Sequence, residues 1–365
     1  MYIVIFCSLI ALLLTYLEST NQAKGGMKWG FFIVTILGMI HYDYGNDYMS
    51  YYEVYKRVTS YNFDLTGILE GDYFSEPGWV LLCWLFKPIG GFFMMVAVLN
   101  LIQNILVYRT IKNYVEKKWL LLSVSIYLFS TSFYLLNFSM MRQGFVVCVF
   151  LGLWPLIKEK KWYLAASILW LCSFVHTSAL VLIPFAFAGF IPIGKGKVWA
   201  SFYIIVFLLL WFSGSMLNDI FISFMSIEEF QNYADTYSIG NNTMKLGVGF
   251  AMNLIPFILG MMYLIDTESE HSVSDKLLVS ISLLSFVIAP FSSISPLAGR
   301  VGMYFGSYQI IAMPLIYKNI KRKDIQWTLL LLFVFMLSYS YLKFFKSPVW
   351  IDKFTTFKTI FPQIF

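Results

Sequence analysis

The chain has 365 residues, of which 59% are hydrophobic, 19% aromatic and only 13% charged, with a formal net charge of +6. An average globular chain carries roughly 25% charged residues, so this composition excludes an ordinary soluble domain and indicates a helical membrane protein. The apolar runs are continuous rather than alternating, which excludes a membrane β-barrel, and the basic residues lie between the runs, which does not suggest nucleic acid binding.

The apolar runs predict an all-α, polytopic fold with about 12 transmembrane helices in a single membrane domain, residues 1–365. The first run lacks a basic leader and a small-residue cleavage site, so we expect a retained helix rather than a signal peptide. The stretch 77–90 is short and interrupted, which favours a re-entrant or interfacial segment. The predicted spans are 2–17, 28–41, 91–109, 119–137, 141–157, 162–176, 177–193, 197–213, 247–265, 276–293, 299–317 and 325–343.

The loops between the runs predict the orientation of the chain. Lysine and arginine concentrate in short loops such as "YRTIKNYVEKKW" and "KNIKRKD", whereas the two longest loops, 42–76 and 214–246, hold few basic residues. Cytoplasmic loops are enriched in basic residues, so the short loops are predicted to be cytoplasmic and the two long loops external, with both chain ends outside. The order of the spans places the acidic loop "DTESEHSVSDK" in the cytoplasm. We keep this assignment because acidic residues contribute little to the positive-inside rule.

Three ionisable residues from distant parts of the chain fall at the outer ends of their predicted helices: Arg142, His176 and Arg300. Asp43 and Asp47, which open the first external loop, and Glu76, which closes it, fall at the same level. Ionisable groups at membrane depth usually face a bundle interior or an aqueous cavity and mark a functional site. We therefore expect these six side chains to meet in one cavity at the outer leaflet.

Two arginines at the membrane surface suit an anionic head group. A guanidinium is a planar fork of donors that matches phosphate and stays charged when partly desolvated. Arg142 and Arg300 are each predicted to begin a helix, whose free N–H groups add to anion binding. A lipid pyrophosphate fits, because its chain stays in the bilayer while its head group reaches the arginines. The alternative is that each arginine only extends to the interface or pairs with a carboxylate.

The segment "GRVGMYFGSYQII" supports a lined cavity. Arg300, Tyr304 and Tyr308 recur at helical spacing and share one predicted face. Gly302 and Gly306 form a GxxxG pair, which permits close packing against a neighbouring helix. The tyrosines either hydrogen-bond a glycan or lie in the aromatic belt at the interface.

A general base is predicted from His176, Asp47 or Glu76. An unperturbed imidazole titrates near pH 6.5 and can act as a base at neutral pH, although a lone histidine is as often structural. The first external loop mixes carboxylates with many tyrosines, a composition suited to sugar rings. The sequence has no P-loop, no GxGxxG after a strand and no cluster of metal ligands, so we expect no cofactor and no metal, and a donor that arrives already activated.

Five segments occur in an order that resembles the EpsG-like branch of the Wzy-type polysaccharide polymerases. The resemblance covers about residues 41–310, and the C-terminal "VWIDKFTTFKTIFPQIF" is faintly similar to the tail of that family. The segments are "YGNDYMSYYEVY", "SEPGWVLL", "NFSMMRQGFVVCVFLGL", "FVHTSALVLIPF" and "GRVGMYF".

The resemblance implies a membrane glycosyltransferase with GT-C-like architecture in the bacterial cytoplasmic (inner) membrane. Such proteins polymerise undecaprenyl-pyrophosphate-linked repeat units at the outer (periplasmic) face, building O-antigen, capsule or exopolysaccharide. The lipid-linked glycan is both donor and acceptor, and membrane lipids, a chain-length regulator and a flippase are implied partners.

By position, the resemblance gives Arg142 and Arg300 the roles of arginines at the pyrophosphate. It matches His176 to the histidine of the family and Asp47 and Glu76 to its acidic loop positions, and leaves open which of the three is the base. The predicted substrate-binding set also contains Gln143, Tyr304 and Tyr44.

Two other functions are consistent with the composition. One is a flippase for the same lipid-linked unit, for which internal repeats and a charged cavity near mid-membrane would be expected. The other is a membrane acyltransferase that modifies sugars, which would commonly take its donor from the cytoplasm. The glycan profile of a deletion strain separates the three: single-repeat products, no surface glycan, or full-length chains that lack a substituent.

Overall fold

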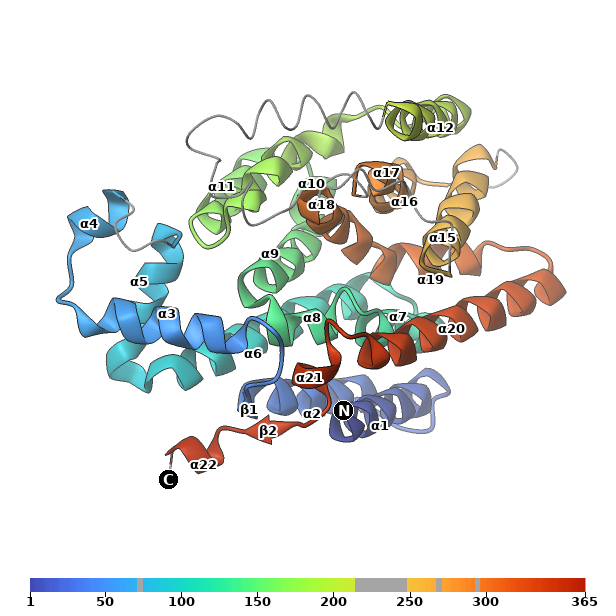
Figure 1. Ribbon diagram of the computed structural model, residues 1–365. Helices are drawn as coiled ribbons and strands as arrows, with labels where there is room; N and C mark the ends of the chain where they lie inside the picture. The colour runs from blue at the N-terminus through green and yellow to red at the C-terminus, as the bar shows by residue number, and fades with distance from the viewer. Residues whose placement is uncertain (71–74, 214–247, 267–270, 293–295, 365) are drawn as a thin grey trace. The chain divides into compact units, whose positions relative to one another are not determined.

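The computed structural model describes residues 1–70, 75–213, 248–266, 271–292 and 296–364, and these are almost entirely helical (Figure 1). The predicted all-helical class is confirmed. The chain divides into two compact units, unit 1 (residues 1–190 and 337–365) and unit 2 (residues 191–336). A single membrane domain therefore stays a prediction, and the second predicted external loop, 214–246, lies outside the described residues.

Unit 1 contains most of the N-terminal half of the chain and the C-terminal tail. Its elements are α1 (Tyr2–Ser19), α2 (Gly26–Ile40), β1 (His41–Tyr42), α3 (Tyr48–Ser60), α4 (Leu65–Glu70), α5 (Pro77–Phe86), η1 (Lys87–Ile89), α6 (Gly91–Tyr114), η2 (Lys117–Trp119), α7 (Leu120–Phe129), α8 (Tyr134–Ser139), α9 (Met141–Gly152), α10 (Trp154–Lys158), α11 (Trp162–Ser173), the 3₁₀ helix η3 (Thr177–Phe190), α21 (Ile351–Phe354), β2 (Lys358–Thr359) and α22 (Phe361–Ile364).

Unit 2 contains the remaining helices, and α20 runs across the boundary between the units. The elements are α12 (Gly196–Phe212), α15 (Val248–Ile265), α16 (Val273–Val287), α17 (Ala289–Ser292), α18 (Pro296–Ser307), α19 (Gln309–Lys318) and α20 (Lys323–Lys346).

The first two helices pack as membrane helices do, with small side chains inside and large apolar side chains outside. The buried face of α1 consists of Val4, Ser8, Ala11 and Thr15. Gly30 of α2 lies so close to this face that an added Cβ would stand 2.8 Å from the carbonyl oxygen of Ala11. Small residues let helix backbones approach closely where no hydrophobic effect drives association. The opposite face of α1 exposes large apolar side chains, including Phe6, Leu9 and Leu13.

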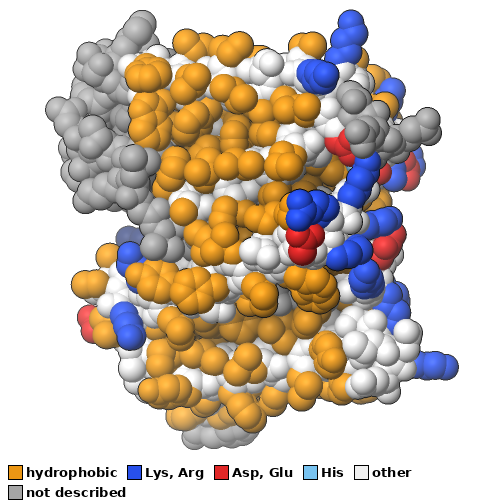
Figure 2. Space-filling model, turned by 90° about the vertical axis from the view of Figure 1, so that its right-hand side faces the viewer, with side chains coloured by type: hydrophobic (Ala, Val, Ile, Leu, Met, Phe, Trp, Pro, Cys, Tyr) orange, Lys and Arg blue, Asp and Glu red, His pale blue; other side chains and the backbone are white. Residues whose placement is uncertain are grey.

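Hydrophobic side chains cover most of the face shown in Figure 2. Four helices or helix pairs among the described residues have the length and composition to cross a membrane: 2–19, 91–114, 141–158 and 323–346. Several shorter apolar helices accompany them, including α2, α11 and α12. The 14 residues of η3 rise about 28 Å at roughly 2.0 Å each, close to the thickness of the hydrocarbon core. These helices support a membrane protein.

The predicted continuous span 119–137 is wrong, because the chain breaks between α7 and α8. The break falls at residues 130–133, in the sequence "STSF". Serine and threonine side chains hydrogen-bond nearby backbone groups and so compete with the helical ladder. A second break at Met140 separates α8 from α9, and the short helix α8 that lies between these breaks is fully buried.

The first predicted external loop, 42–76, is itself partly helical, since it contains α3 and α4. The C-terminal tail pairs with the start of this loop. β2 lies antiparallel to β1, with His41 opposite Thr359. The carboxylate of Asp43 accepts hydrogen bonds from Lys353 Nζ at 2.8 Å and Lys358 Nζ at 3.1 Å. Residues more than 300 positions apart are thereby joined around the chain segment that leads into α3.

Replacing Asp43 with asparagine should loosen the tail. Burial raises the pKa of the Asp43 carboxyl, but the hydrogen bonds and charges of Lys353 and Lys358 outweigh it and hold that pKa below its usual 3.8. The stabilisation is thus present above about pH 3.8 and is lost as the pH falls through the lower folded-state pKa. We expect a loss of about 1 kcal/mol and faster proteolysis after residue 346 at pH 7. Unchanged proteolysis in low salt would contradict the pairing.

Candidate active site

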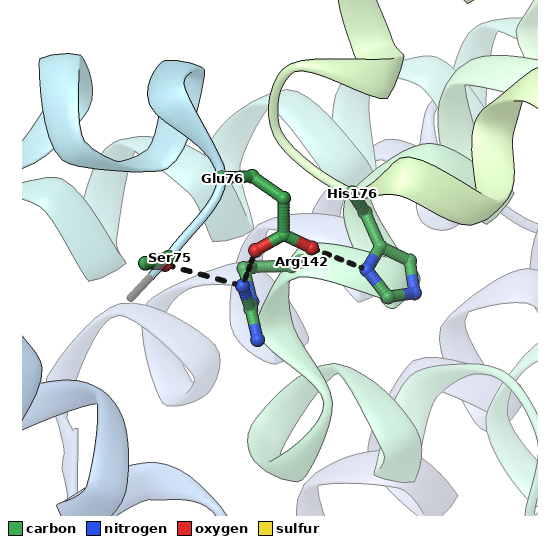
Figure 3. A network of polar contacts seen from close by, with 4 residues as sticks. All are labelled: Ser75, Glu76, Arg142 and His176. Atoms are coloured by element: carbon green, nitrogen blue, oxygen red, sulfur yellow. Dashed lines mark hydrogen bonds and ion pairs between the residues drawn. The ribbon is translucent and has the colours of Figure 1, made fainter. Parts of the chain in front are cut away.

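A carboxylate, a guanidinium and an imidazole from three distant segments of unit 1 meet in one cluster (Figure 3). Glu76 immediately precedes α5, Arg142 is the second residue of α9, and His176 lies between α11 and η3. Glu76 Oε2 accepts a hydrogen bond from Arg142 Nη1, and Glu76 Oε1 lies 3.3 Å from His176 Nδ1. Arg142 Nη1 also donates to the hydroxyl of Ser75 at 3.3 Å. The three charged or titratable side chains are only 15–24% exposed, so the cluster is partly shielded from solvent.

The sequence "SEPGW" explains how Glu76 reaches this position. Pro77 occupies the first turn of α5, where its missing N–H costs no helical hydrogen bond. The N–H of Gly78 donates to the carbonyl oxygen of Phe174 at 2.7 Å, which fixes the start of α5 against the end of α11. An added Cβ at Gly78 would stand 2.8 Å from backbone atoms of Phe174, so only glycine permits this approach. Glu76 lies two residues before Gly78, and His176 lies two residues after Phe174, so this contact brings Glu76 and His176 together.

Replacing Gly78 with alanine should separate Glu76 from His176. The clash is with backbone rather than with a flexible side chain, so α5 must shift. We expect a loss of activity of at least about tenfold, since a displacement of about 1 Å at a catalytic group has a large effect on rate. A matched control is Gly194→Ala, because an added Cβ there meets nothing within 4 Å. Normal activity of the Gly78→Ala protein would show that this contact does not position Glu76.

Aromatic rings surround the guanidinium of Arg142. Its central carbon lies 5.3 Å from the ring centre of Tyr51 and 5.9 Å from that of Trp79. Ring faces attract a cation, most strongly where water is partly excluded. Arg142 also lies at the N-terminus of α9, where the helix dipole favours negative charge. The place is therefore suited to an anion that approaches the guanidinium.

The electrostatics of the cluster assign different roles to its members. Burial raises the pKa of the Glu76 carboxyl, but the hydrogen bond to His176 and the charge of Arg142 outweigh it and hold that pKa below its usual range. Glu76 is therefore ionised at neutral pH and accepts hydrogen bonds only. His176 must donate its Nδ1–H to that carboxylate, and Nε2 then carries the lone pair. This Nε2 atom is buried and has no hydrogen-bond partner among the described residues.

Two other predicted residues lie near the cluster. Asp47 immediately precedes α3, one helical turn before Tyr51. Burial raises the pKa of the Tyr51 hydroxyl, and the negative charge of Asp47 also acts to raise it. Its backbone N–H donates to the hydroxyl of Ser139 at 3.3 Å. Gln143, next to Arg142, is 1% exposed and belongs to the buried face of α9. Roles for Asp47 and Gln143 in catalysis and binding stay predictions.

Tyr44 has the surroundings of a core residue. Its side chain is fully buried, and its ring makes edge contacts with Phe138, Phe354 and Phe357 at centroid distances of 4.8–5.3 Å. Its hydroxyl has no hydrogen-bond partner in the described part of the chain. The substrate-binding role of Tyr44 stays a prediction, and it would need this side chain to leave its packing.

Arg300 and Tyr304 belong to unit 2, on α18, so their meeting with Arg142 and His176 stays a prediction. The prediction that Arg300 begins a helix is wrong, because α18 begins at Pro296. α18 ends at Ser307, before Tyr308, so the predicted continuous face is interrupted. Tyr304 and Tyr308 are fully buried. An added Cβ at Gly302 would meet its nearest atom, an oxygen of α16, only at 3.6 Å, an ordinary contact that does not require glycine.

Sequence reasoning missed four residues that shape the cluster. Ser75, Tyr51 and Trp79 contact Arg142, and Gly78 brings α5 to α11. The segment "SEPGW" carried one signal, since proline at a helix start next to a glycine marks a constrained backbone. Tyr51 carried none, because it is one of several similar tyrosines in its segment.

Within the described ranges, no group of three or more histidine, cysteine, aspartate and glutamate side chains is arranged to hold a metal ion. A comparison with protein families matches residues 28–358 to the EpsG family. No curated protein and no solved structure matches the chain.

Proposed function

The chain belongs to the EpsG family, and from this premise we propose that it is a membrane glycosyltransferase that polymerises undecaprenyl-pyrophosphate-linked oligosaccharide repeat units. The family indicates a membrane protein resembling polysaccharide polymerases. The lipid-linked substrate, the outer face of the bacterial cytoplasmic membrane and a GT-C-like architecture of about 12 spans are parts of the proposal. The products are surface glycans, such as O-antigen, capsule or exopolysaccharide.

One observation carries the proposal: Glu76 links Arg142 to His176 in a single, partly buried cluster. A carboxylate that orients an imidazole through Nδ1 is a recurring way to prepare Nε2 as a general base. The same carboxylate accepts a hydrogen bond from the guanidinium of Arg142, and a guanidinium is the group best matched to a phosphate. When a hydroxyl displaces a pyrophosphate, a base must accept the proton of the hydroxyl and a cation must stabilise the leaving pyrophosphate. His176 and Arg142 are suited to these two roles.

The proposed step is a direct displacement. His176 Nε2 takes the proton of an acceptor hydroxyl, and that oxygen attacks the anomeric carbon of the donor glycan. The bond from this carbon to the pyrophosphate oxygen breaks, and the lipid pyrophosphate leaves with both bonding electrons, so the anomeric centre inverts. Arg142 stabilises the negative charge that grows on the leaving group, and charge stabilisation of this kind raises the rate.

Arg142 forms an ion pair with the carboxylate of Glu76, a pairing that the sequence allowed as an alternative to anion binding. This pairing is consistent with the proposal, because Glu76 also holds His176 and thus links the two roles. Arg300 is proposed as the second arginine at the pyrophosphate. Asp47 is proposed to help to bind the acceptor sugar beside Tyr51, and a chain-length regulator and a flippase are proposed as partners.

The proposal is tested in a strain that lacks the gene for this chain and carries plasmid copies of it. Wild type should restore long surface glycans, whereas Glu76→Gln should leave mostly single repeats, because His176 loses its charged acceptor. Glu53→Gln, which changes an exposed carboxylate on α3, is the matched control. Absence of all surface glycan in the deletion strain would instead indicate a flippase, and full-length glycan lacking a substituent would indicate an acyltransferase.

A further inference from the structure

Unit 1 contains an apolar groove of about 1010 Å³ formed by α5, α6, α9 and α11. Its lining side chains are all hydrophobic, and a single glycine, Gly78, interrupts them. Several large side chains of the lining are exposed, among them Leu85 at 56% and Trp170 at 52%. The groove is therefore open along one side and offers a hydrophobic chain a continuous surface.

The groove is lined by residues that neighbour the polar cluster in the chain. Pro77 and Gly78 line it and follow Glu76 in the chain, while Val175 lines it and precedes His176. Phe145, a further lining residue, lies about one helical turn after Arg142 on α9. Three segments of the groove lining thus each lie next to one member of the cluster in the chain.

We propose that this groove binds the isoprenoid chain of the lipid-linked pyrophosphate while the head group lies at Arg142, an inference that rests on the proposed function. An isoprenoid diphosphate carries a charged head group on a long apolar chain. This division matches a cluster that contains Arg142 and an apolar groove lined by residues beside that cluster in the chain. Burial of each apolar carbon adds to affinity, so a long chain binds more strongly than a short one.

The rings of the groove suit such a chain. Trp170 and Phe174 meet edge to face at 4.8 Å, and Phe63 meets Trp84 in the same way at 5.6 Å. These pairs hold their rings in fixed orientations and leave flat apolar faces for contact. A groove kept open by packed rings loses little conformational entropy when a ligand enters it.

The direct experiment places a photoreactive benzophenone amino acid at position 85 of the full-length protein in phosphatidylcholine nanodiscs. The probe is undecaprenyl pyrophosphate with a terminal alkyne, and the control position is Leu13 of α1, which is 57% exposed and lies outside the groove. We expect about tenfold more adduct at position 85 than at position 13, and competition by undecaprenyl pyrophosphate but much less by farnesyl pyrophosphate. Equal labelling at both positions, or equal competition by added phospholipid, would overturn the inference in favour of ordinary bilayer lipid.

A kinetic experiment separates this inference from the proposed function. Leu85→Trp should narrow the groove and raise the KM for a defined lipid-linked repeat unit about tenfold with kcat nearly unchanged, whereas Leu13→Trp should change neither. If Leu85→Trp behaves as wild type while Arg142→Ala loses elongation, the groove assignment fails and the proposed function stands. If position 85 is labelled selectively but the protein elongates nothing, the groove stands and the proposed function fails.

Discussion

Replacing Arg142 with alanine should lower kcat for elongation of a defined lipid-linked repeat unit by about 10²–10³-fold, since one well-placed charge-stabilising donor typically contributes that much. The effect should fall mainly on kcat, because the charge on the pyrophosphate grows as the glycosidic bond breaks. Arg142→Lys should recover only part of the rate, since an ammonium keeps the charge but loses the planar fork. The measurement is a cell-free assay with purified protein, in which chain length is followed on a gel.

Loss of Arg142 also leaves Glu76 without its positive partner, and an uncompensated charge in a partly buried site destabilises the fold. The double variant Arg142→Ala with Glu76→Gln removes both charges and serves as the stability control. Its thermal stability should return toward wild type while elongation stays lost. Full elongation by the single variant would exclude Arg142 from the reaction.

Replacing His176 with asparagine should lower kcat by about 10²–10⁴-fold, the usual contribution of a general base. The asparagine amide can still donate a hydrogen bond toward Glu76, so packing is largely kept, but it cannot take a proton. The measurement is kcat of the purified wild type and the variant in the same cell-free elongation assay, together with the thermal stability of each.

A purely structural histidine gives a different result. In that case His176→Asn would lower thermal stability and the amount of folded protein, while the folded fraction would keep the wild-type kcat. Glu76→Gln is the informative partner variant, because it removes the charged acceptor for Nδ1–H and leaves the imidazole in place. We expect its rate to lie between those of wild type and His176→Asn.

Much of the architecture could be predicted because membrane helices are specified locally. Apolar runs of fixed length predicted most of the long helices of the described ranges, whereas the breaks within runs and the helices α3 and α4 of the first predicted external loop were missed. The break after α7 depends on three consecutive small polar residues, whose effect on a helix is decided by the surrounding packing. The pairing of Asp43 with Lys353 and Lys358 joins opposite ends of the chain, and no local pattern indicates it.

The cluster itself was predicted only in part. Topology placed Arg142, His176 and Glu76 at one level of the membrane, and the structure joins these three through hydrogen bonds. Topology could not show that Glu76 lies between the other two, because this depends on the close contact of Gly78 with Phe174. The burial of Tyr44 among Phe138, Phe354 and Phe357 could not be predicted either, because it depends on contacts with the distant C-terminal tail.

The central claim is tested most directly by purified full-length protein in nanodiscs that is given one defined undecaprenyl-pyrophosphate-linked repeat unit and no other component. The proposed function predicts a ladder of longer lipid-linked glycans and release of one undecaprenyl pyrophosphate for each repeat added. Binding of the lipid-linked unit by folded protein, with neither elongation nor release, would contradict it.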